Sequence, residues 1–456
     1  MSAQTKYNQI DKYFVQAVLR DPLHVGTGDT DSKSVDVLVH PITEKPFIQA
    51  SSITGAIREY LTRNYAGEEI SYLFENGRLI FTDAVFNENE DTQIELRPRV
   101  SIEPKTGTVL ESNVTSGGKS GAKFEMEYVG AGATLAFNVY LYSDKDDGKV
   151  GDNNRKIEEA LSAINSGIIK FGGQKSNGCG RVKVDKIIKS TYDMTTEDGR
   201  KNWKNEGNNE SGENIQIESL PAASTDLAYS IVVEAKTESE LQVRSIGVTS
   251  VQDFNLDSEN IINAQGKHIV PGSAFKGIIR SQMDMIARYR LGERQASKLI
   301  ETCFGVTKQN GEEEANTTGI VTFYDCEIGK PSDAITRSRI HIDKSTGGTF
   351  QGALFSERNV KGDKIEFNID VAKANGNIVE ESTALILLAL RDLAIGMINI
   401  GNGYNVGKGF LTDAIITITD VSTGKVSKID SQKETVEDEA EIITKCMNAL
   451  CRKDVK

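Results

Sequence analysis

The sequence predicts an α+β protein made of two tandem ferredoxin-like domains, and three observations lead to this prediction. Four sequence blocks occur twice in the same order, and their alignment superimposes Gly55 on Gly277 and Gly178 on Gly407. Each copy has the succession of strand-like and amphipathic helical segments of a β-α-β-β-α-β unit. With 456 residues, the chain is also too long for one hydrophobic core.

The repeated blocks are short, but their order is the same in both halves. The pairs are "IQASSITGAIR" (48–58) with "VPGSAFKGIIR" (270–280), "RVSIEPKTG" (99–107) with "RIHIDKSTG" (339–347), "FEMEYVGAG" (124–132) with "LFSERNVKG" (354–362), and "FGGQKSNGCG" (171–180) with "IGNGYNVGKG" (400–409). This alignment also places Glu127 on Glu357. Ordered repetition of this kind indicates two copies of one domain.

The elements follow in the same order in each copy. A strand is expected at 12–21 and 228–236, a helix behind the Gly-Ser turn at 51–65 and 272–290, strands at 78–86 and 319–328, a hairpin-like arm around each TG turn, a second helix at 155–169 and 382–398, and a last strand at 181–189 and 411–421. We therefore set the two domains at residues 11–190 and 225–423.

Two further segments complete the chain. Residues 191–224 are polar, acidic and rich in Gly and Asn, so we expect a solvated linker in which Trp203 packs loosely rather than as a docking anchor. Residues 433–456 predict a C-terminal amphipathic helix, with acidic residues in its first turn and basic residues in its last.

Composition excludes several classes of protein. A net charge of −13 argues against indiscriminate nucleic-acid binding, because counterion release needs clustered Lys and Arg. No run approaches the ~20 apolar residues of a membrane span. The five cysteines form no CxxC pair and the four histidines are scattered, so we expect no structural zinc site and a reducing, cytoplasmic location.

The Gly-rich loops do not fit the nucleotide-binding motifs. In "GNGYNVGKG" (401–409), Val406 stands where a dinucleotide fingerprint needs its third glycine, and the loop follows a predicted helix instead of a strand. In the first copy Cys179 stands where a Walker loop needs lysine. We instead expect the glycines to let the backbone approach a polyanion closely.

Two local excesses of positive charge predict a phosphate-binding face. Residues 168–190 hold six basic residues and one acid, and residues 267–294 hold six basic residues and two acids. Ser273 is expected to cap the second repeat's first helix, whose free amides would attract an anion beside Lys276 and Arg280. The candidate binding residues are Ser51, Ser52, Arg58, Lys170, Lys175, Arg181, Ser273, Lys276, Arg280 and Lys408. Ordinary solvated helix and strand positions remain the alternative for each.

Taken together, the loop "LHVGTGDT" (23–30) and the repeated blocks resemble the RAMP superfamily, and most closely the backbone subunits of type III CRISPR effector complexes. The resemblance covers residues 11–190 and 225–420. It implies two RNA-recognition-like cores, each with a helical insertion and a β-hairpin thumb. It also implies guide RNA, single-stranded target RNA and other effector subunits as partners, with no membrane.

The resemblance further implies a loop aspartate that is required for metal-dependent cleavage of target RNA at regularly spaced kinks. Counting back from the Gly-Ser turn selects Asp257 in the second copy and falls one residue from Asp36 in the first. We expect these two carboxylates to be catalytic and to hold Mg²⁺, with the RNA 2′-OH as the nucleophile. Asp29, Asp31 and Asp253 are close enough in sequence to take their place.

Two other functions stay open. The chain could be a scaffold subunit that binds the guide without cutting, which the loop aspartates alone would distinguish. It could also process guides, but that chemistry uses general acid–base residues, and His24 and His268 near the Gly-rich turns form no evident catalytic set.

Overall fold

The structure is a computed structural model. It describes residues 7–26, 34–87, 93–100, 102, 111–113, 119–121, 123–146, 148–205, 211–245, 256–306, 317–329 and 333–451. The chain divides into two compact units, of which unit 1 comprises Met1–Leu96, Met126–Lys175 and Cys179–Thr225, and unit 2 comprises Arg97–Glu125, Ser176–Gly178 and Asp226–Lys456. The units thus follow the two repeats, except that two segments of the first repeat group with unit 2.

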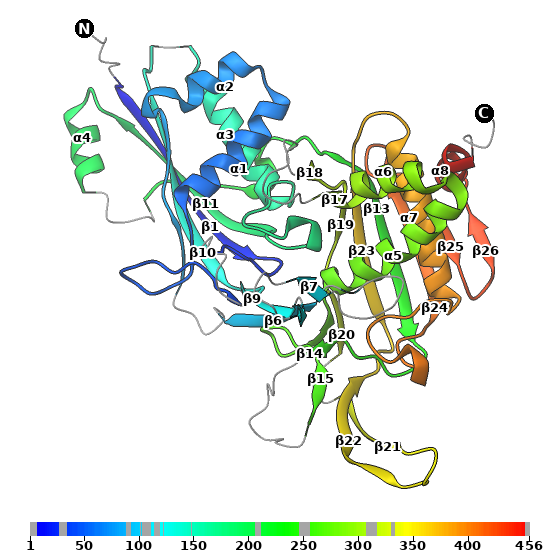
Figure 1. The fold of residues 1–456 in the computed structure, drawn as a ribbon. Coiled ribbons are helices and arrows are strands. Elements are labelled where there is room, and N and C mark those ends of the chain that lie inside the picture. Colours follow the sequence, from blue (N-terminus) through cyan, green and yellow to red (C-terminus); the bar gives the residue numbers. More distant parts are fainter. Residues whose placement is uncertain are drawn as a thin grey trace. The chain divides into compact units, whose positions relative to one another are not determined.

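Unit 1 is built on an antiparallel sheet whose strand order confirms the ferredoxin-like pattern (Figure 1). Its strands are β1 (Gln9–Leu19), β3 (Phe47–Ile48), β4 (Leu79–Phe81), β5 (Ala84–Phe86), β10 (Thr134–Ser143), β11 (Val182–Asp193) and β12 (Glu213–Ile215). β1 lies between β10 and β11, and β4 and β5 pair with the other edge of β10. Val15, Ala17 and Leu19 alternate along β1 and are buried, as a half-buried strand requires.

Three helices of unit 1 contribute apolar stripes to its core. They are α1 (Ala50–Asn64), α2 (Gly67–Phe74) and α3 (Val150–Asn165). On α1, Ile53, Ile57, Tyr60 and Leu61 recur at helical spacing and are buried, so this face packs in the core while the opposite face stays exposed. The predicted helices at 51–65 and 155–169 are thereby confirmed to within a few residues.

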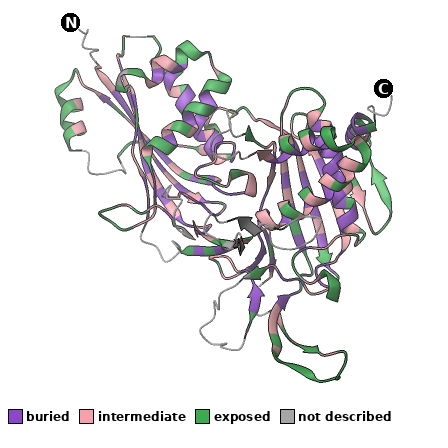
Figure 2. Cartoon of the chain, viewed as in Figure 1, coloured by how far each residue is buried: buried purple, intermediate pink, exposed green. Residues whose placement is uncertain are grey.

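Unit 2 repeats the plan and extends it. Its sheet has the order β19 (Val321–Phe323), β23 (Ile365–Ala372), β13 (Leu227–Thr237), β24 (Leu411–Asp420), β25 (Val426–Asp430) and β26 (Thr435–Glu437). The helices are α5 (Gly272–Leu291), α6 (Glu293–Phe304), α7 (Ile378–Ala394) and α8 (Ile442–Cys451). Buried positions gather where α5 and α7 face the sheet (Figure 2).

Each repeat also carries a β-ribbon outside its central sheet. The second arm is the hairpin of β21 (Ala334–Ile342) and β22 (Thr349–Val360), and the first arm consists of β6 (Ile94–Val100) and β9 (Lys123–Val129). Short strands join the base of each arm: β2 (Ser34–Val35) beside β9, and β14 (Arg244–Ser245) with β15 (Ser258–Asn260) beside β22. β16 (His268–Val270) pairs with β20 (Cys326–Gly329). The remaining short strands are β7 (Glu111–Asn113), β8 (Lys119–Gly121), β17 (Gly305–Val306) and β18 (Thr317–Thr318).

The expected solvated linker is folded where the structure describes it. β12 adds an edge strand beside β11, and α4 (Glu197–Lys204) places Trp203 edge-on against Tyr140 and Tyr192, with ring centroids 5.8 and 5.3 Å away. Trp203 is therefore a half-buried anchor, contrary to the loose packing that we expected. The polar composition predicted a solvated linker, but the contacts of Trp203 with Tyr140 and Tyr192 are enough to hold the short helix α4 against the sheet.

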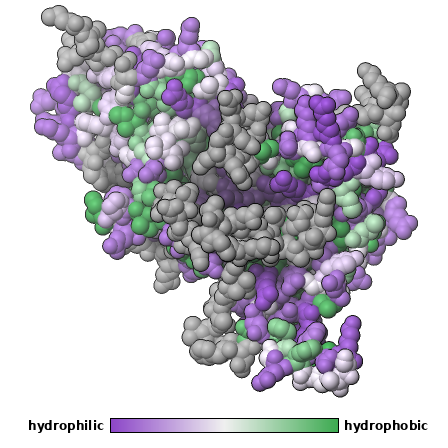
Figure 3. Space-filling view, in the orientation of Figure 1, coloured by the Kyte–Doolittle hydropathy of each residue, from purple (hydrophilic) through white to green (hydrophobic). Residues whose placement is uncertain are grey.

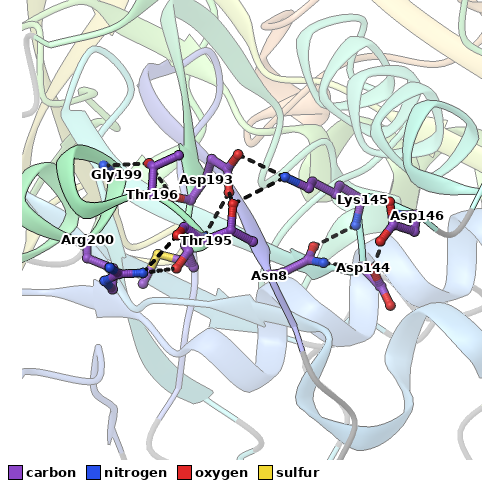
Figure 4. Close-up of polar contacts among 10 residues, drawn as sticks. Asn8, Asp144, Lys145, Asp146, Asp193, Thr195, Thr196, Gly199 and Arg200 are labelled. Carbon is purple, nitrogen blue, oxygen red and sulfur yellow. Dashed lines mark hydrogen bonds and ion pairs between the residues drawn. The ribbon is translucent and has the colours of Figure 1, made fainter.

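Polar bonds fasten the start of this segment (Figure 4). Asp193 accepts from the Thr195 backbone N–H at 2.8 Å and from Lys145 at 3.1 Å. Bonds from the Thr195 side chain and backbone, followed by Lys145, lower the pKa of Asp193 to about 2. Thr196 then caps α4 by accepting from the Gly199 N–H at 3.0 Å. These contacts make residues 193–200 part of unit 1.

The C-terminal helix is shorter than predicted. Residues 433–437 belong to the β25–β26 hairpin, and α8 begins at Ile442. Asp438 fixes this start, because its carboxylate accepts from the backbone N–H groups of Ile443 and Thr444 at 3.0 and 2.7 Å. Within the described residues, none of the helices combines the length and the apolar character needed to cross a membrane. All five cysteines are free thiols.

Candidate nucleic-acid interface

The repeated Gly-Ser turn is held by an internal aspartate in both repeats. The Ala50 N–H at the start of α1 donates to Asp83 at 2.7 Å, and the Gly272 N–H at the start of α5 donates to Asp325 at 2.8 Å. The N-cap residues are Gln49 and Pro271, with no side-chain cap bond, so the expectation that Ser273 caps the helix was wrong. An internal carboxylate therefore already accepts from the first of the amides that we expected to attract an anion at each helix start.

The aspartates could have been found in the sequence. "FTDAVF" (81–86) and "FYDCEI" (323–328) are corresponding blocks that both contain Asp after the first strand. In unit 2 the carboxylate of Asp325 also pairs with Arg97 at 2.7 Å, so its charge is balanced within the fold.

Two glycines on these helices have no structural reason in the described fold. Gly55 and Gly277 are each the sixth residue of their helix, both are exposed, and a Cβ at either position would meet nothing within 4 Å. Glycine at an exposed helix position costs about 1 kcal/mol relative to alanine. Repetition of this unfavourable choice at equivalent positions suggests that another molecule approaches the helix closely there.

An arginine follows each of these exposed glycines by three residues and lies over an aromatic ring. Arg58 is exposed with its guanidinium 5.6 Å from the Phe74 ring centroid, and Arg280 is exposed with its guanidinium 5.4 Å from that of Phe304. Stacking orients each planar guanidinium while leaving its edge available to a phosphate. Ser51 and Ser52 are exposed in the same first turn of α1, and Ser273 is half-buried.

Lys276 is the most perturbed cation of this surface. Burial, followed by the charges of Arg280 and Arg99, lowers the pKa of Lys276 to about 8. Its ammonium donates to the Ser176 hydroxyl at 2.8 Å, and both residues belong to unit 2. Repulsion among three cations is relieved when an anion binds, so this cluster favours a phosphate.

The Gly-rich loops approach the protein's own backbone. A Cβ on Gly172 would lie 2.3 Å from the His24 carbonyl oxygen, and one on Gly401 would lie 2.2 Å from that of Gln242. Both glycines have positive φ, +71° and +80°. Our expectation that these glycines serve contact with a polyanion was therefore wrong for the two positions, where they allow the Gly-rich loop to pack on the segment that follows the first strand.

The basic residues of the loops are unequal. Lys175 is exposed and Lys170 is half-buried. Arg181 forms an ion pair with Asp21, with 2.9 Å between Nη2 and Oδ1. Lys408 is buried, and its ammonium donates to Glu357 at 2.6 Å and to Asn359 at 2.9 Å. Of these four candidates, Lys175 is thus the one that the fold presents to solvent.

Both arms present apolar side chains to solvent, which sequence reasoning did not identify as candidates. Those of the second arm appear green at the bottom of the space-filling view (Figure 3). They are Ile340, Ile342, Phe350, Leu354 and Phe355 on the second arm, and Ile94, Leu96, Val100, Ile102 and Phe124 on or beside the strands of the first arm. Solvent-exposed apolar side chains on a β-ribbon are suited to stacking on bases or wedging between them.

Asp257 is exposed at the base of the second arm, and its carboxylate has a defined orientation. Its Oδ2 accepts from the Ser356 N–H at 2.7 Å, while its own N–H donates to the Ser356 carbonyl at 2.9 Å. Asp36 is exposed next to β2. The alternatives Asp29, Asp31 and Asp253 lie outside the described residues.

Strand pairing shows which loop residues correspond in the two repeats. Leu23 bridges Val129, Gly26 bridges Val37 and Val39 bridges Pro46 in the first repeat, whereas Leu241 bridges Val360, Arg244 pairs with Asn260 and Ile262 bridges His268 in the second. The first partner on this path lies three residues after the bridge to the arm in both repeats (Gly26 and Arg244), and its mate lies two residues before the next bridge (Val37 and Asn260). Val37 therefore corresponds to Asn260, whereas the turn that follows is one residue longer in the first repeat.

Counting back from this pair places Asp36 at the position of Glu259, and Ser34 at the position of Asp257. Glu259 is a buried residue 3.8 Å from Arg358. Asp36 and Asp257, which counting from the turn had treated as partners, are therefore two residues out of register.

The two histidines near the turns are both buried, with 6% of His24 and 0% of His268 exposed. His24 also bonds through Nδ1 to the Glu127 carbonyl at 2.8 Å. Neither ring is presented to a substrate, so neither histidine is placed for general acid–base catalysis.

Comparison with known proteins agrees with this geometry. The chain is similar to the CRISPR system Cms endoribonuclease Csm3 of Streptococcus thermophilus, with 27% identity over 212 residues that cover 41% of this chain and 93% of that protein. The family model of the RAMP superfamily matches residues 17–183 and 204–412, which together are more than half of the chain and correspond to the two repeats. The protein therefore belongs to the RAMP superfamily and contains two tandem copies of its domain.

Proposed function

We propose that this chain is a backbone subunit of a type III CRISPR effector complex, which binds guide RNA together with other subunits in the cytoplasm and cleaves single-stranded target RNA paired to the guide. The similarity to a Csm3 endoribonuclease over nearly all of that protein's length supports the class of complex. Three features support RNA as the ligand: the exposed glycines Gly55 and Gly277, the arginines stacked on aromatic rings, and the exposed apolar side chains of the two arms.

The observation that carries the cleavage proposal is the position of Asp257. Its carboxylate is exposed and is held by Ser356 at the base of the arm whose tip presents apolar side chains. An arm that displaces one nucleotide leaves the neighbouring backbone bent, and a bent backbone can bring a 2′-OH into line with the adjacent phosphate. Asp257 would then act on a phosphodiester that the arm has already distorted.

The reaction needs little from the protein beyond position and charge. The 2′-oxygen bonds to phosphorus, the bond from phosphorus to the 5′-oxygen breaks, and the products are a 2′,3′-cyclic phosphate and a 5′-OH. Asp257 accepts the proton of the 2′-OH, directly or through water, and the leaving oxygen takes a proton from solvent. Arg280 and Lys276 are the candidate cations to offset the charge of the phosphate.

A bound Mg²⁺ would supply further neutralisation of the phosphate charge. Across the described residues, no three His, Cys, Asp or Glu side chains gather into a metal site. One exposed carboxylate nevertheless fits this ion, which commonly keeps several waters and takes phosphate oxygens as ligands. Asp257 is the residue that would hold it.

The test uses the full-length chain assembled with guide RNA and its partner subunits, and an end-labelled complementary RNA. Asp257→Asn keeps an oxygen that can accept from Ser356 but removes the charge, so we expect cleavage to fall at least about 100-fold while the Kd for the target stays within twofold. Asp413→Asn on β24 is the matched control, because asparagine tolerates the left-handed backbone of that residue, φ 53°. Unchanged cleavage in Asp257→Asn contradicts the catalytic role. Tight binding with no cleavage by the wild-type complex would leave a guide scaffold as the function.

A further inference from the structure

The base of the second arm contains a cluster of charges around the buried ammonium of Lys408. Lys408 donates to Glu357 at 2.6 Å and to Asn359 at 2.9 Å, and Arg339 also contacts Glu357. Burial alone would raise the pKa of Glu357, but the bonds from Lys408 and Arg339 lower it overall, so this carboxylate stays ionised at neutral pH. Glu357 directly follows Ser356, the residue that holds Asp257.

The cluster ties the arm to two other parts of unit 2. Lys408 comes from the Gly-rich loop, and Asn359 donates to Glu240 at 2.9 Å, which lies just after β13. Glu240 in turn accepts from Arg337 on β21 at 2.8 Å. A chain of alternating charges and amides therefore fixes the strand that positions Asp257 relative to the central sheet.

The first repeat has different residues at the corresponding positions. The Gly180 N–H donates to the Pro22 carbonyl, as the Gly409 N–H donates to that of Glu240, so Cys179 corresponds to Lys408. The bridges that equate Val129 with Val360 likewise equate Met126 with Glu357 and Tyr128 with Asn359. The earlier alignment of Glu127 with Glu357 was thus one residue out of register.

Cys179, Met126 and Tyr128 form a buried apolar cluster of their own. The same three positions are therefore filled by Lys, Glu and Asn in one repeat and by Cys, Met and Tyr in the other. The Lys, Glu and Asn side chains bond to one another, and the Cys, Met and Tyr side chains pack together, so the whole cluster differs between the repeats and not a single residue. It coincides with the replacement of the exposed acid, since Ser34 occupies the position of Asp257.

We propose that the two repeats divide the work, with the second repeat cleaving RNA and the first binding RNA without cleaving it. The proposal rests on the proposed function and assigns one cleavage site to the chain, instead of the two sites that the pair of aspartates predicted from the sequence would give. Two separate observations support it. The register of the loop places Ser34 where the second repeat has Asp257. The three cluster positions of the first repeat also lack the charged residues that, in the second repeat, fix the strand holding Asp257. Both repeats keep the open glycine and the stacked arginine, so both retain the features expected for binding.

The experiment maps the cuts in an end-labelled target RNA with complexes assembled on one guide from full-length chains. The variants are Asp257→Asn and the double variant Ser34→Ala/Asp36→Asn, each tested first for target binding by filter retention to verify assembly. We expect the first to lose every cut, with rates at least about 100-fold lower, and the second to keep the wild-type positions and rates within twofold.

The possible results distinguish a failure of the proposed division of work from a failure of the proposed cleavage function. If the double variant loses a set of cuts that Asp257→Asn retains, the division of work is wrong while the proposed cleavage function stands. If Asp257→Asn keeps all cuts, the second repeat does not cut through this acid and the proposal is also overturned. If the wild-type complex binds the target but makes no cut, the proposed cleavage function itself fails.

Discussion

Replacing the open glycine of α5 by alanine should change stability and RNA binding in opposite directions. In Gly277→Ala the added methyl group meets nothing within 4 Å, so no repacking cost is expected. Alanine is favoured over glycine in a helix by about 1 kcal/mol, which corresponds to a rise of about 2–4 °C in Tm for a domain of about 200 residues. Gly55→Ala on α1 should behave in the same way.

RNA binding should weaken in the same variants. If a sugar–phosphate backbone lies against the helix at van der Waals distance, the methyl group intrudes on it, and overpacking of this kind typically costs about 1–3 kcal/mol. That range corresponds to a Kd at least about fivefold higher at 25 °C. A structural glycine could not produce this combination of higher Tm and lower affinity.

The assay pairs thermal unfolding of the free chain with titration of labelled guide RNA. Gly151→Ala is the matched control, because Gly151 is also an exposed helical glycine with nothing within 4 Å but belongs to α3 and not to the repeated turn. It should gain stability without losing affinity. Unchanged RNA affinity in Gly277→Ala, together with the gain in Tm, would refute the inference that RNA approaches this helix.

Three other predictions follow from the contacts. Because the pKa of Lys276 lies at about 8, RNA affinity should fall as pH rises from 7 to 9, and Lys276→Arg, which stays charged, should remove this fall in a salt-matched titration. Glu357→Met should destabilise the chain by about 3–5 kcal/mol in urea unfolding, since it leaves the buried Lys408 ammonium without its carboxylate partner, whereas the triple change with Lys408→Cys and Asn359→Tyr should recover most of that loss. Asp83→Ala should lower the free energy of unfolding by about 1 kcal/mol, because the start of α1 loses its acceptor.

Each of these has a result that contradicts it. An identical pH dependence in wild type and Lys276→Arg would remove the lysine from the RNA contact. A triple variant as unstable as Glu357→Met alone would mean that the first repeat's apolar cluster cannot replace the charged one. An Asp83→Asn variant as unstable as Asp83→Ala would point to the charge, and not the hydrogen bond, as the stabilising feature.

The repeat and the order of its elements could be predicted from the sequence because they depend on local patterns. Amphipathic runs identified α1, α5 and the second helix of each repeat, and alternation identified β1 and β13. The β25–β26 hairpin was missed because its residues are polar and its acidic end is typical of a helix start. Composition alone could not show that Trp203 would find two aromatic partners.

The site was harder to predict because it depends on which way a side chain points and on the exact register of loops. A lysine in a Gly-rich loop is expected to face solvent, yet Lys408 is buried because its ammonium bonds to Glu357 and Asn359. One extra residue at the base of an arm moved the alignment of Glu127 by one position. Asp36 was selected by counting, and strand pairing shows that a count across turns of different length does not preserve register.

The central claim is that a bent RNA strand is cleaved by its own 2′-OH beside Asp257. The most direct measurement places a single 2′-deoxynucleotide at each cut position of the target in turn and maps the products of the wild-type complex. We predict that each deoxy position loses its own cut and no other, and that the remaining upstream fragments end in 2′,3′-cyclic phosphate. Cleavage that continues at the substituted positions, or fragments that end in a 3′-OH, would contradict the account.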